Sequence, residues 1–301
     1  MKKSAISICI SLMTVGASLA GNLSTTYTGF DPRTSQNDLV QGITYQLPDP
    51  AVFGPGPYPV FAWTDGSLEN FGDPLGLTMV RQMAMRGFIA ATIEYSNTNI
   101  VQNCNSYTSR AQSVYDATRS GSAINVLCNL PGASCAKGVV TAGISQGGML
   151  SVLAKNYAPN VKASFAMSVS DFDQNGSINL SSCMDKQFTA IPADRLMIVN
   201  GQDDTIFGGQ TPLQNVSGYT CPVGTYQCWS PQLNGAGWYI IQNSQVVDGQ
   251  ADHCYELIGG CTGTSFDTNW YLPSTQNWSL APNLDWLASF GTKRVFSTTP
   301  E

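Results

Sequence analysis

Two hydrophobic patterns alternate along the chain. Apolar runs rich in β-branched and aromatic residues, as expected of strands buried on both faces, occupy residues 58–64, 88–95, 138–144, 162–169, 195–200 and 237–242. Apolar residues at helical spacing lie at residues 74–86, 106–128, 146–157 and 283–290. Two earlier segments, residues 24–30 and 42–47, alternate as strands do. Strands that alternate with helices predict an α/β fold, with a mainly parallel, doubly wound sheet and helices on both faces.

The first twenty residues have a different pattern from the rest. Lys2 and Lys3 precede a largely apolar run, residues 4–17, and small side chains follow at Ser18 and Ala20. This is the pattern of a secretory signal peptide that is cleaved after Ala20. The run is short for a membrane span, and a membrane anchor is the alternative. We expect residues 21–301 to form a single α/β domain of a secreted, extracellular or periplasmic protein.

Cysteines are frequent after the predicted signal peptide. They are Cys104, Cys128, Cys135, Cys183, Cys221, Cys228, Cys254 and Cys261. An even number in an exported chain favours four disulfides over thiols or metal ligands. Three equal intervals suggest the local bridges Cys128–Cys135, Cys221–Cys228 and Cys254–Cys261. Cys104 would then pair with Cys183, and a bridge to Cys128 is the competing choice. The CxxC spacings of zinc sites are missing, so we expect no metal.

Charged residues make up only 11% of the chain, and the formal net charge is −6. No cluster of lysine or arginine could neutralise a phosphate backbone or an acidic lipid surface, which argues against nucleic-acid partners and a stable membrane contact. Serine, threonine, asparagine, glutamine and glycine supply the polar surface instead, as in many loop-rich extracellular proteins. We expect the chain to be a monomer.

The most specific motif is GISQG at residues 143–147, where a predicted strand ends and a predicted helix begins. It fits GxSxG, in which a serine occupies a turn so tight that side chains two residues away would collide. Gly143 and Gly147 remove those side chains, so Ser145 would stand at the carboxyl edge of the sheet, where active sites of such sheets lie. The amide of Gln146 would point toward a developing oxyanion. An ordinary strand-to-helix turn is the alternative.

A serine hydroxyl needs a neighbouring base near neutral pH, and His253 is the only histidine in the chain. It follows the last predicted strand, in the loop DGQADHCYE. The acid that orients it should follow the preceding strand, where LMIVNG leads into QDDTIF. Asp204, three residues after Gly201, is preferred over Asp203, and the alternative is that both only cap a turn. The order Ser, Asp, His along the chain agrees with a hydrolase triad.

With these residues in place, the chain resembles the α/β-hydrolase superfamily. Within it, the chain is similar to secreted esterases of the cutinase, lipase and polyester-hydrolase kind. GISQG is similar to the GYSQG of cutinases, and DTI after Asp203 is similar to a segment of bacterial polyester hydrolases. The resemblance covers roughly residues 40–290 and implies an α/β-hydrolase fold. Residues 171–195 leave room for a small lid at most.

One departure from the family concerns the second oxyanion amide. Family members usually carry His-Gly after the third strand, whereas this chain has Asp65 and Gly66. Aligning Asp65 with that histidine assigns the second amide to Ser67, with Gly66 as the next choice. Trp63 would line the acyl pocket, or else be a buried core residue.

The resemblance implies a carboxylic ester hydrolase that works through an acyl-enzyme and needs no cofactor. Ser145 would attack the ester carbonyl, with His253 as the base and Asp204 as its orienting acid. Small or polymeric esters, including lipids and polyesters, would suit an open cleft. Trp229 and Trp238 could form a flat apolar wall, and exposed aromatics of a lid or ordinary core packing are the alternatives. Two alternatives are a secreted serine peptidase with the same triad and a catalytically silent binding protein with the same fold.

Overall fold

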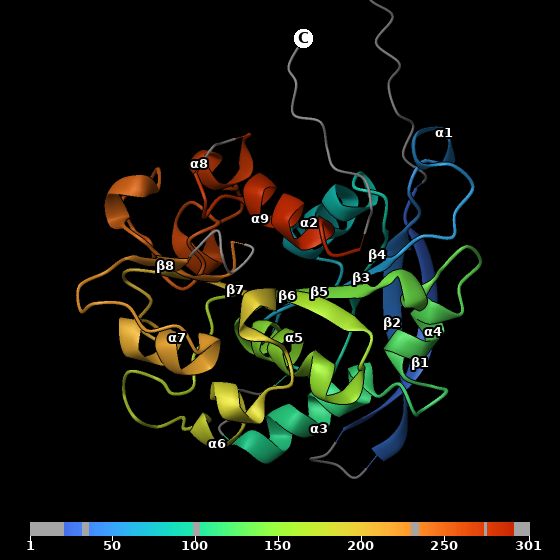
Figure 1. Cartoon of the computed structure of the whole chain (residues 1–301), viewed down its shortest axis with the longest axis horizontal. Coiled ribbons are helices and arrows are strands. Elements are labelled where there is room, and N and C mark those ends of the chain that lie inside the picture. Colours follow the sequence, from blue (N-terminus) through green and yellow to red (C-terminus); the bar gives the residue numbers. More distant parts are fainter. Residues whose placement is uncertain (1–20, 32–35, 99–102, 230–234, 274–275, 292–301) are drawn as a thin grey trace, which may run out of the picture.

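The computed structural model of the chain describes residues 21–31, 36–98, 103–229, 235–273 and 276–291. The predicted signal peptide lies outside these residues. Within them, a nine-stranded sheet has the order β1-β2-β4-β3-β5-β6-β7-β9-β8 (Figure 1). Its strands are β1 Leu23–Asp31, β2 Gln36–Gln46, β3 Val60–Thr64, β4 Ile89–Ile93, β5 Val139–Ile144, β6 Val161–Met167, β7 Leu196–Gly201, β8 Gln227–Trp229 and β9 Gly237–Ile241.

The sheet is mainly parallel, as the sequence predicted. Strands β4, β3, β5, β6, β7 and β9 pair in parallel, whereas β2 and β8 pair antiparallel with their neighbours. Every residue of β3, β4 and β5 is buried. The continuous apolar runs of these strands therefore reflect contact with helices on both faces.

Helices cover both faces of the sheet, which confirms the doubly wound arrangement (Figure 1). One face packs against α2 Pro74–Ala84, α8 Thr268–Tyr271 and α9 Leu280–Ala288. The other packs against α3 Cys104–Tyr115, α4 Ala123–Cys128, α5 Ser145–Tyr157, α6 Ser181–Met184 and α7 Gln210–Ser217. A further short helix, α1 Pro50–Phe53, has no buried residues. None of the helices that the structure describes combines the length and apolar composition of a membrane span.

The single helix predicted over residues 106–128 is wrong, because the structure has two helices there. α3 ends before Asp116, whose backbone is extended. The Asp116 carboxylate accepts hydrogen bonds from the amide (2.9 Å) and hydroxyl (2.6 Å) of Thr118, which stabilises a turn in place of further helix. Ser122 then caps the start of α4. Hydrogen bonds that the Asp116 and Ser122 side chains accept from nearby backbone amides therefore end one helix and begin the next, although the apolar residues keep helical spacing throughout. The sequence analysis also missed α1, α6 to α8 and β8.

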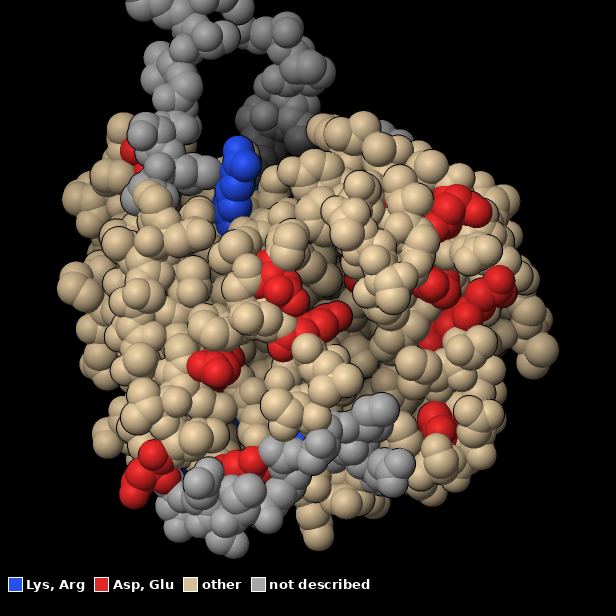
Figure 2. Space-filling view, turned by 180° about the vertical axis from the view of Figure 1, so that it is seen from behind, with Lys and Arg blue, Asp and Glu red and all other residues tan. Residues whose placement is uncertain are grey.

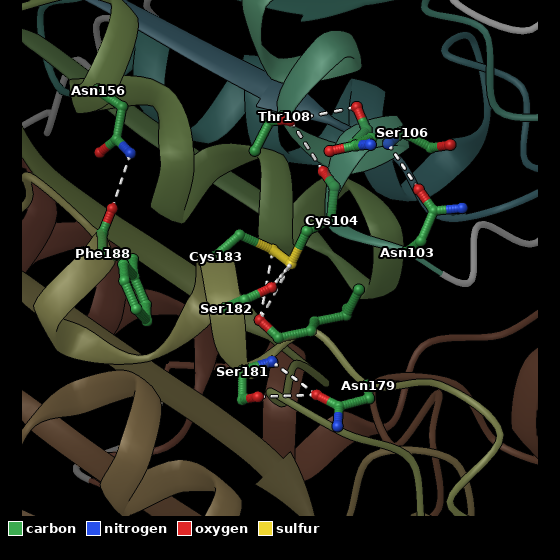
Figure 3. The surroundings of a disulfide bond; sticks show 12 residues. Asn103, Cys104, Ser106, Thr108, Asn156, Asn179, Ser181, Ser182, Cys183 and Phe188 are labelled. Atoms are coloured by element: carbon green, nitrogen blue, oxygen red, sulfur yellow. Dashed lines mark hydrogen bonds between the residues drawn. A yellow bond between two sulfur atoms is a disulfide. The ribbon is translucent and has the colours of Figure 1, made fainter.

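All four predicted disulfides are present, Cys104–Cys183, Cys128–Cys135, Cys221–Cys228 and Cys254–Cys261. The competing Cys104–Cys128 bridge is therefore wrong. Figure 3 shows that the Cys104–Cys183 bridge joins the start of α3 to α6, with the Ser182 hydroxyl beside the Cys104 sulfur (3.2 Å). This bridge anchors the segment that the sequence analysis assigned to a small lid.

Candidate active site

Ser145 lies at the turn from β5 into α5, with a backbone φ of 52°. This left-handed conformation is costly for a residue with a side chain and is typical of functional turns. A Cβ atom on Gly147 would lie 2.1 Å from the carbonyl oxygen of Thr64, and one on Gly143 would lie 2.6 Å from the same atom. The end of β3 therefore approaches the turn so closely that only glycine fits on both sides of the serine.

His253 and Asp204 are in direct contact. Nδ1 of His253 lies 2.9 Å from Oδ2 of Asp204, whose side chain is completely buried, whereas the imidazole is 12% exposed. The other carboxylate oxygen accepts hydrogen bonds from the amides of Ile206 (2.9 Å) and Phe207 (2.8 Å). Because an ionised carboxylate only accepts, Nδ1 carries the proton in this arrangement, and Nε2 is the nitrogen with a lone pair for proton transfer.

Asp203, the alternative acid, has a different hydrogen-bond partner. Its side chain is exposed, and its Oδ2 accepts a hydrogen bond from Nδ2 of Asn243 at 2.7 Å. The structure therefore brings Asp204, and not its neighbour, to the imidazole.

A cavity of about 480 Å³ has both Ser145 and His253 in its wall. Apolar side chains make up much of the remaining lining, together with one disulfide: Leu68, Ile144, Ile178, Ile206, Phe207 and Cys254–Cys261. The Phe207 ring centre lies 5.7 Å from that of the imidazole. Among the described residues, no group of His, Cys, Asp and Glu side chains is arranged to hold a metal ion. The cavity thus brings the strained serine and the sole imidazole together in largely apolar surroundings.

The two residues predicted to form the oxyanion hole are joined by their side chains. Nε2 of Gln146 donates to Oγ of Ser67 (3.0 Å), and Oε1 of Gln146 accepts from Nη1 of Arg110 (2.6 Å). The amide of Gly66, the alternative donor, already donates to the carboxylate of Glu69. An amide that is engaged in this way is poorly suited to bind an oxyanion, which favours Ser67 as the second donor.

Strand β2 lies antiparallel beside a parallel core, and the glycine-flanked serine follows β5. The acid follows β7 and the histidine follows β9, so the triad candidates occur in the order Ser, Asp, His. The chain has the α/β-hydrolase fold. Each proposed catalytic side chain of this α/β-hydrolase fold follows the carboxyl end of a parallel strand, which explains how residues more than a hundred positions apart meet.

No protein-family model matches the chain, and no curated protein sequence matches it. Similar solved structures include brefeldin A esterase, a bacterial homologue of human hormone sensitive lipase, at 13% identity and a TM-score of 0.41, over 65% of this chain and 63% of that one. An α/β serine hydrolase without a lid from Xanthomonas campestris aligns at 13% identity and a TM-score of 0.41, over 62% and 74% of the two chains. A Pyrococcus furiosus esterase aligns at 10% identity and a TM-score of 0.43, over 65% and 76%.

The chain spans less than two thirds of the length of the brefeldin A esterase. Similarities this distant carry no assignment of activity, so a functional interpretation has to rest on the residues of the cavity.

The tryptophans considered for substrate contact do not line the cavity that contains Ser145, and burial bears out the alternative of core packing for Trp63 and Trp238. Trp63 is completely buried in the core between the sheet and α2, where its Nε1 donates to Asp65. Trp238 is also completely buried, and its Nε1 donates to the carbonyl oxygen of Tyr219 (2.9 Å). Trp229 is 40% exposed, but it lies on the edge strand β8. No tryptophan occurs among the described residues that line the cavity.

Asp65, which the sequence analysis aligned with a histidine, is buried. Its two carboxylate oxygens accept hydrogen bonds from Nε1 of Trp63 (2.6 Å) and Oγ1 of Thr92 (3.1 Å). Its carbonyl oxygen accepts from the hydroxyl of Tyr95 (2.7 Å). Burial raises the pKa of the Asp65 carboxyl to about 8. These contacts fix the end of β3, and Asp65 does not line the cavity that contains Ser145.

The sequence analysis missed Glu69 and Arg110. Glu69 lines the cavity. Burial raises the pKa of its carboxyl, while the Gly66 amide and then the charge of His253 act in the opposite direction. Its place in the segment DGSLENFG, close after the predicted oxyanion residue, was a signal that could have singled it out. Arg110 lies within α3, and nothing in its sequence context marks it.

Proposed function

We propose that the chain is a serine hydrolase that cleaves carboxylic esters through an acyl-enzyme. The observation that carries this proposal is the cavity shared by Ser145, on its strained turn, and His253, whose Nδ1 contacts the buried carboxylate of Asp204. Nucleophile, base and orienting acid in this order form a catalytic arrangement that recurs on unrelated folds.

In the proposed reaction, Oγ of Ser145 attacks the ester carbonyl carbon while its proton passes to Nε2 of His253. The amides of Gln146 and Ser67 stabilise the negative charge on the carbonyl oxygen. When the tetrahedral intermediate collapses, the proton moves from Nε2 to the leaving alcohol, and an acyl-enzyme remains. Water then gives a proton to Nε2 and attacks the acyl carbon. When this second intermediate collapses, the bond to Oγ breaks, the proton returns from Nε2 to Oγ of Ser145, and the carboxylic acid leaves. Asp204 stabilises the imidazolium in both steps.

The apolar lining of the cavity supports esters with an apolar acyl or alcohol part, including lipid and polyester substrates. Ile178, from the segment proposed as a small lid, forms one side of the cavity, and the Cys104–Cys183 bridge anchors that segment. Four disulfides support a protein that is secreted into an oxidising compartment.

The test compares Ser145→Ala with Ser182→Ala, which removes an exposed hydroxyl outside the cavity. We expect the first variant to lose turnover of 4-nitrophenyl esters and labelling by a fluorophosphonate probe, and the second to keep both. Both variants should melt close to the parent, because an alanine at residue 145 removes a single oxygen.

A panel of peptide substrates distinguishes the serine peptidase alternative. Rapid peptide cleavage with little ester cleavage would favour a peptidase. An unlabelled, inactive parent protein would favour a binding protein that keeps the fold without the chemistry. Ester turnover that persists in Ser145→Ala would overturn the assignment of the nucleophile.

A further inference from the structure

Glu69 lies two residues after the proposed oxyanion residue Ser67, and it faces the space where substrate would bind. It lines the cavity that contains Ser145 and His253, and it also lines a neighbouring cavity of about 380 Å³. Glu69 and Leu68 thus belong to the wall shared by the two cavities. Leu68 is 72% exposed and has a backbone φ of 67°, so an apolar side chain is held in a costly conformation at the same wall.

Hydrogen bonds within its own loop and from Asn97 hold Glu69 in place. The amide of Gly66 donates to Oε2, and Nδ2 of Asn97 donates to the carbonyl oxygens of both Gly66 (2.8 Å) and Glu69 (2.7 Å). The amide of Leu68 donates in turn to the carbonyl oxygen of Asn97 (3.1 Å). Among the described residues, Oε1 of Glu69 has no hydrogen-bond partner, so this oxygen is available to act on a bound molecule.

The charged side chains around both cavities are acidic, apart from the imidazole of His253. Asp73 joins Glu69 in the cavity with Ser145, and Glu94 joins it in the neighbouring one. The buried Asp65, whose pKa is raised to about 8, also lines the neighbouring cavity. No lysine or arginine occurs among the described residues that line either cavity. Arg110 is buried behind Gln146 and lines neither. Figure 2 shows that one whole face of the molecule also carries far more acidic than basic side chains.

We propose that Glu69 makes the cavity select uncharged or cationic esters and reject esters that carry a free carboxylate near the scissile bond. This inference rests on the proposed ester hydrolysis. A second carboxylate on the substrate would be brought close to Oε1 in a cavity with largely apolar walls that stays open to solvent, where like charges repel more strongly than in bulk water. The attraction between Glu69 and the imidazolium of His253 is the same for every ester, so it cancels when two substrates are compared. The same repulsion favours departure of the carboxylate product.

The experiment uses dimethyl adipate and monomethyl adipate, which share the scissile methyl ester and differ by one negative charge. We compare the ratio of their kcat/KM values in the parent, in Glu69→Gln and in Asp285→Asn, at mildly alkaline pH, because burial raises the pKa of the Glu69 carboxyl. Asp285→Asn removes the same charge from α9, which lines neither cavity. Glutamine keeps an oxygen that can accept from Gly66.

We expect Glu69→Gln to lower the preference for the diester about three- to tenfold, and Asp285→Asn to leave it unchanged. In the parent protein, high salt should also reduce the preference, which tests the idea without a substitution. A preference that is the same in Glu69→Gln and the parent, or that does not respond to salt, would overturn the inference while leaving ester hydrolysis intact. A parent protein that cleaves neither ester would overturn both proposals.

Discussion

Replacing Asp204 by asparagine should disable the proposed triad with almost no change in volume. An asparagine carbonyl can keep the two hydrogen bonds from the amides of Ile206 and Phe207, which turns its NH2 group toward Nδ1 of His253. Nδ1 must then accept a hydrogen bond, so the imidazole proton moves to Nε2. That nitrogen can no longer take the proton of Ser145. The same tautomer error costs about 10⁴ in kcat in a serine protease, and we expect a loss of roughly 10³ to 10⁴ here.

The matched control is Asp203→Asn, which changes the adjacent, exposed carboxylate. Asparagine can still accept the hydrogen bond from Asn243, so kcat should stay within about twofold of the parent. The assay is kcat and KM on a neutral soluble ester, with a thermal melt of each variant. KM should change little in Asp204→Asn, because the acid acts on the base and not on bound substrate. Equal losses in the two variants, or a nearly active Asp204→Asn, would refute the role of Asp204.

Two further predictions concern pH and disulfides. Burial raises the pKa of Asp65 to about 8, so between about pH 4 and that value the folded chain holds a proton that the unfolded chain releases, and stability falls as pH rises through this window. Asp65→Asn should flatten the fall of the free energy of unfolding, measured by urea titration at each pH, by up to about 1.4 kcal/mol per pH unit, and an unchanged slope would contradict the assigned burial. Loop entropy gives about 4.5 kcal/mol for Cys104–Cys183 and about 2.4 kcal/mol for Cys254–Cys261, at sequence separations of 79 and 7. Replacing Cys104 and Cys183 by serine should lower the free energy of unfolding more than replacing Cys254 and Cys261. Replacing Cys254 and Cys261, beside the proposed base, should lower kcat more. If one replacement had the larger effect in both assays, this reasoning would be contradicted.

Local constraints made part of the candidate site predictable. The turn at Ser145 needs glycine on both sides for steric reasons that are only partly local. A Cβ atom on Gly143 would lie 2.5 Å from the backbone of Gly147 in the same turn, whereas one on Gly147 would meet Thr64 at the end of β3. His253 stood out because the chain has no second histidine. The GxxD spacing favoured Asp204, but Asp203 and Asp204 are adjacent in one loop, and either carboxylate could orient a histidine. Only the position of the imidazole distinguishes them.

Other parts of the site depend on contacts between distant segments. Glu69 sits in the cavity wall because Asn97, in the segment after β4, holds its loop through two hydrogen bonds. Trp63 and Trp238 have the same apolar character as a substrate-binding tryptophan, and burial alone decides that they belong to the core. Arg110 reaches Gln146 across the space between α3 and α5. None of these relations leaves a periodicity or a spacing in the sequence.

The sequence by itself determined the α/β fold, the tight turn that carries Ser145 and the cysteine pairs separated by seven residues. Each of these is set by residues close together in the chain, through side-chain period, steric exclusion or short loop closure. Tertiary structure alone decided which aspartate meets His253, that the amide of Gly66 is engaged by Glu69 and what charge surrounds the cavity. These depend on where strand ends meet at one edge of the sheet, a relation that local sequence does not encode.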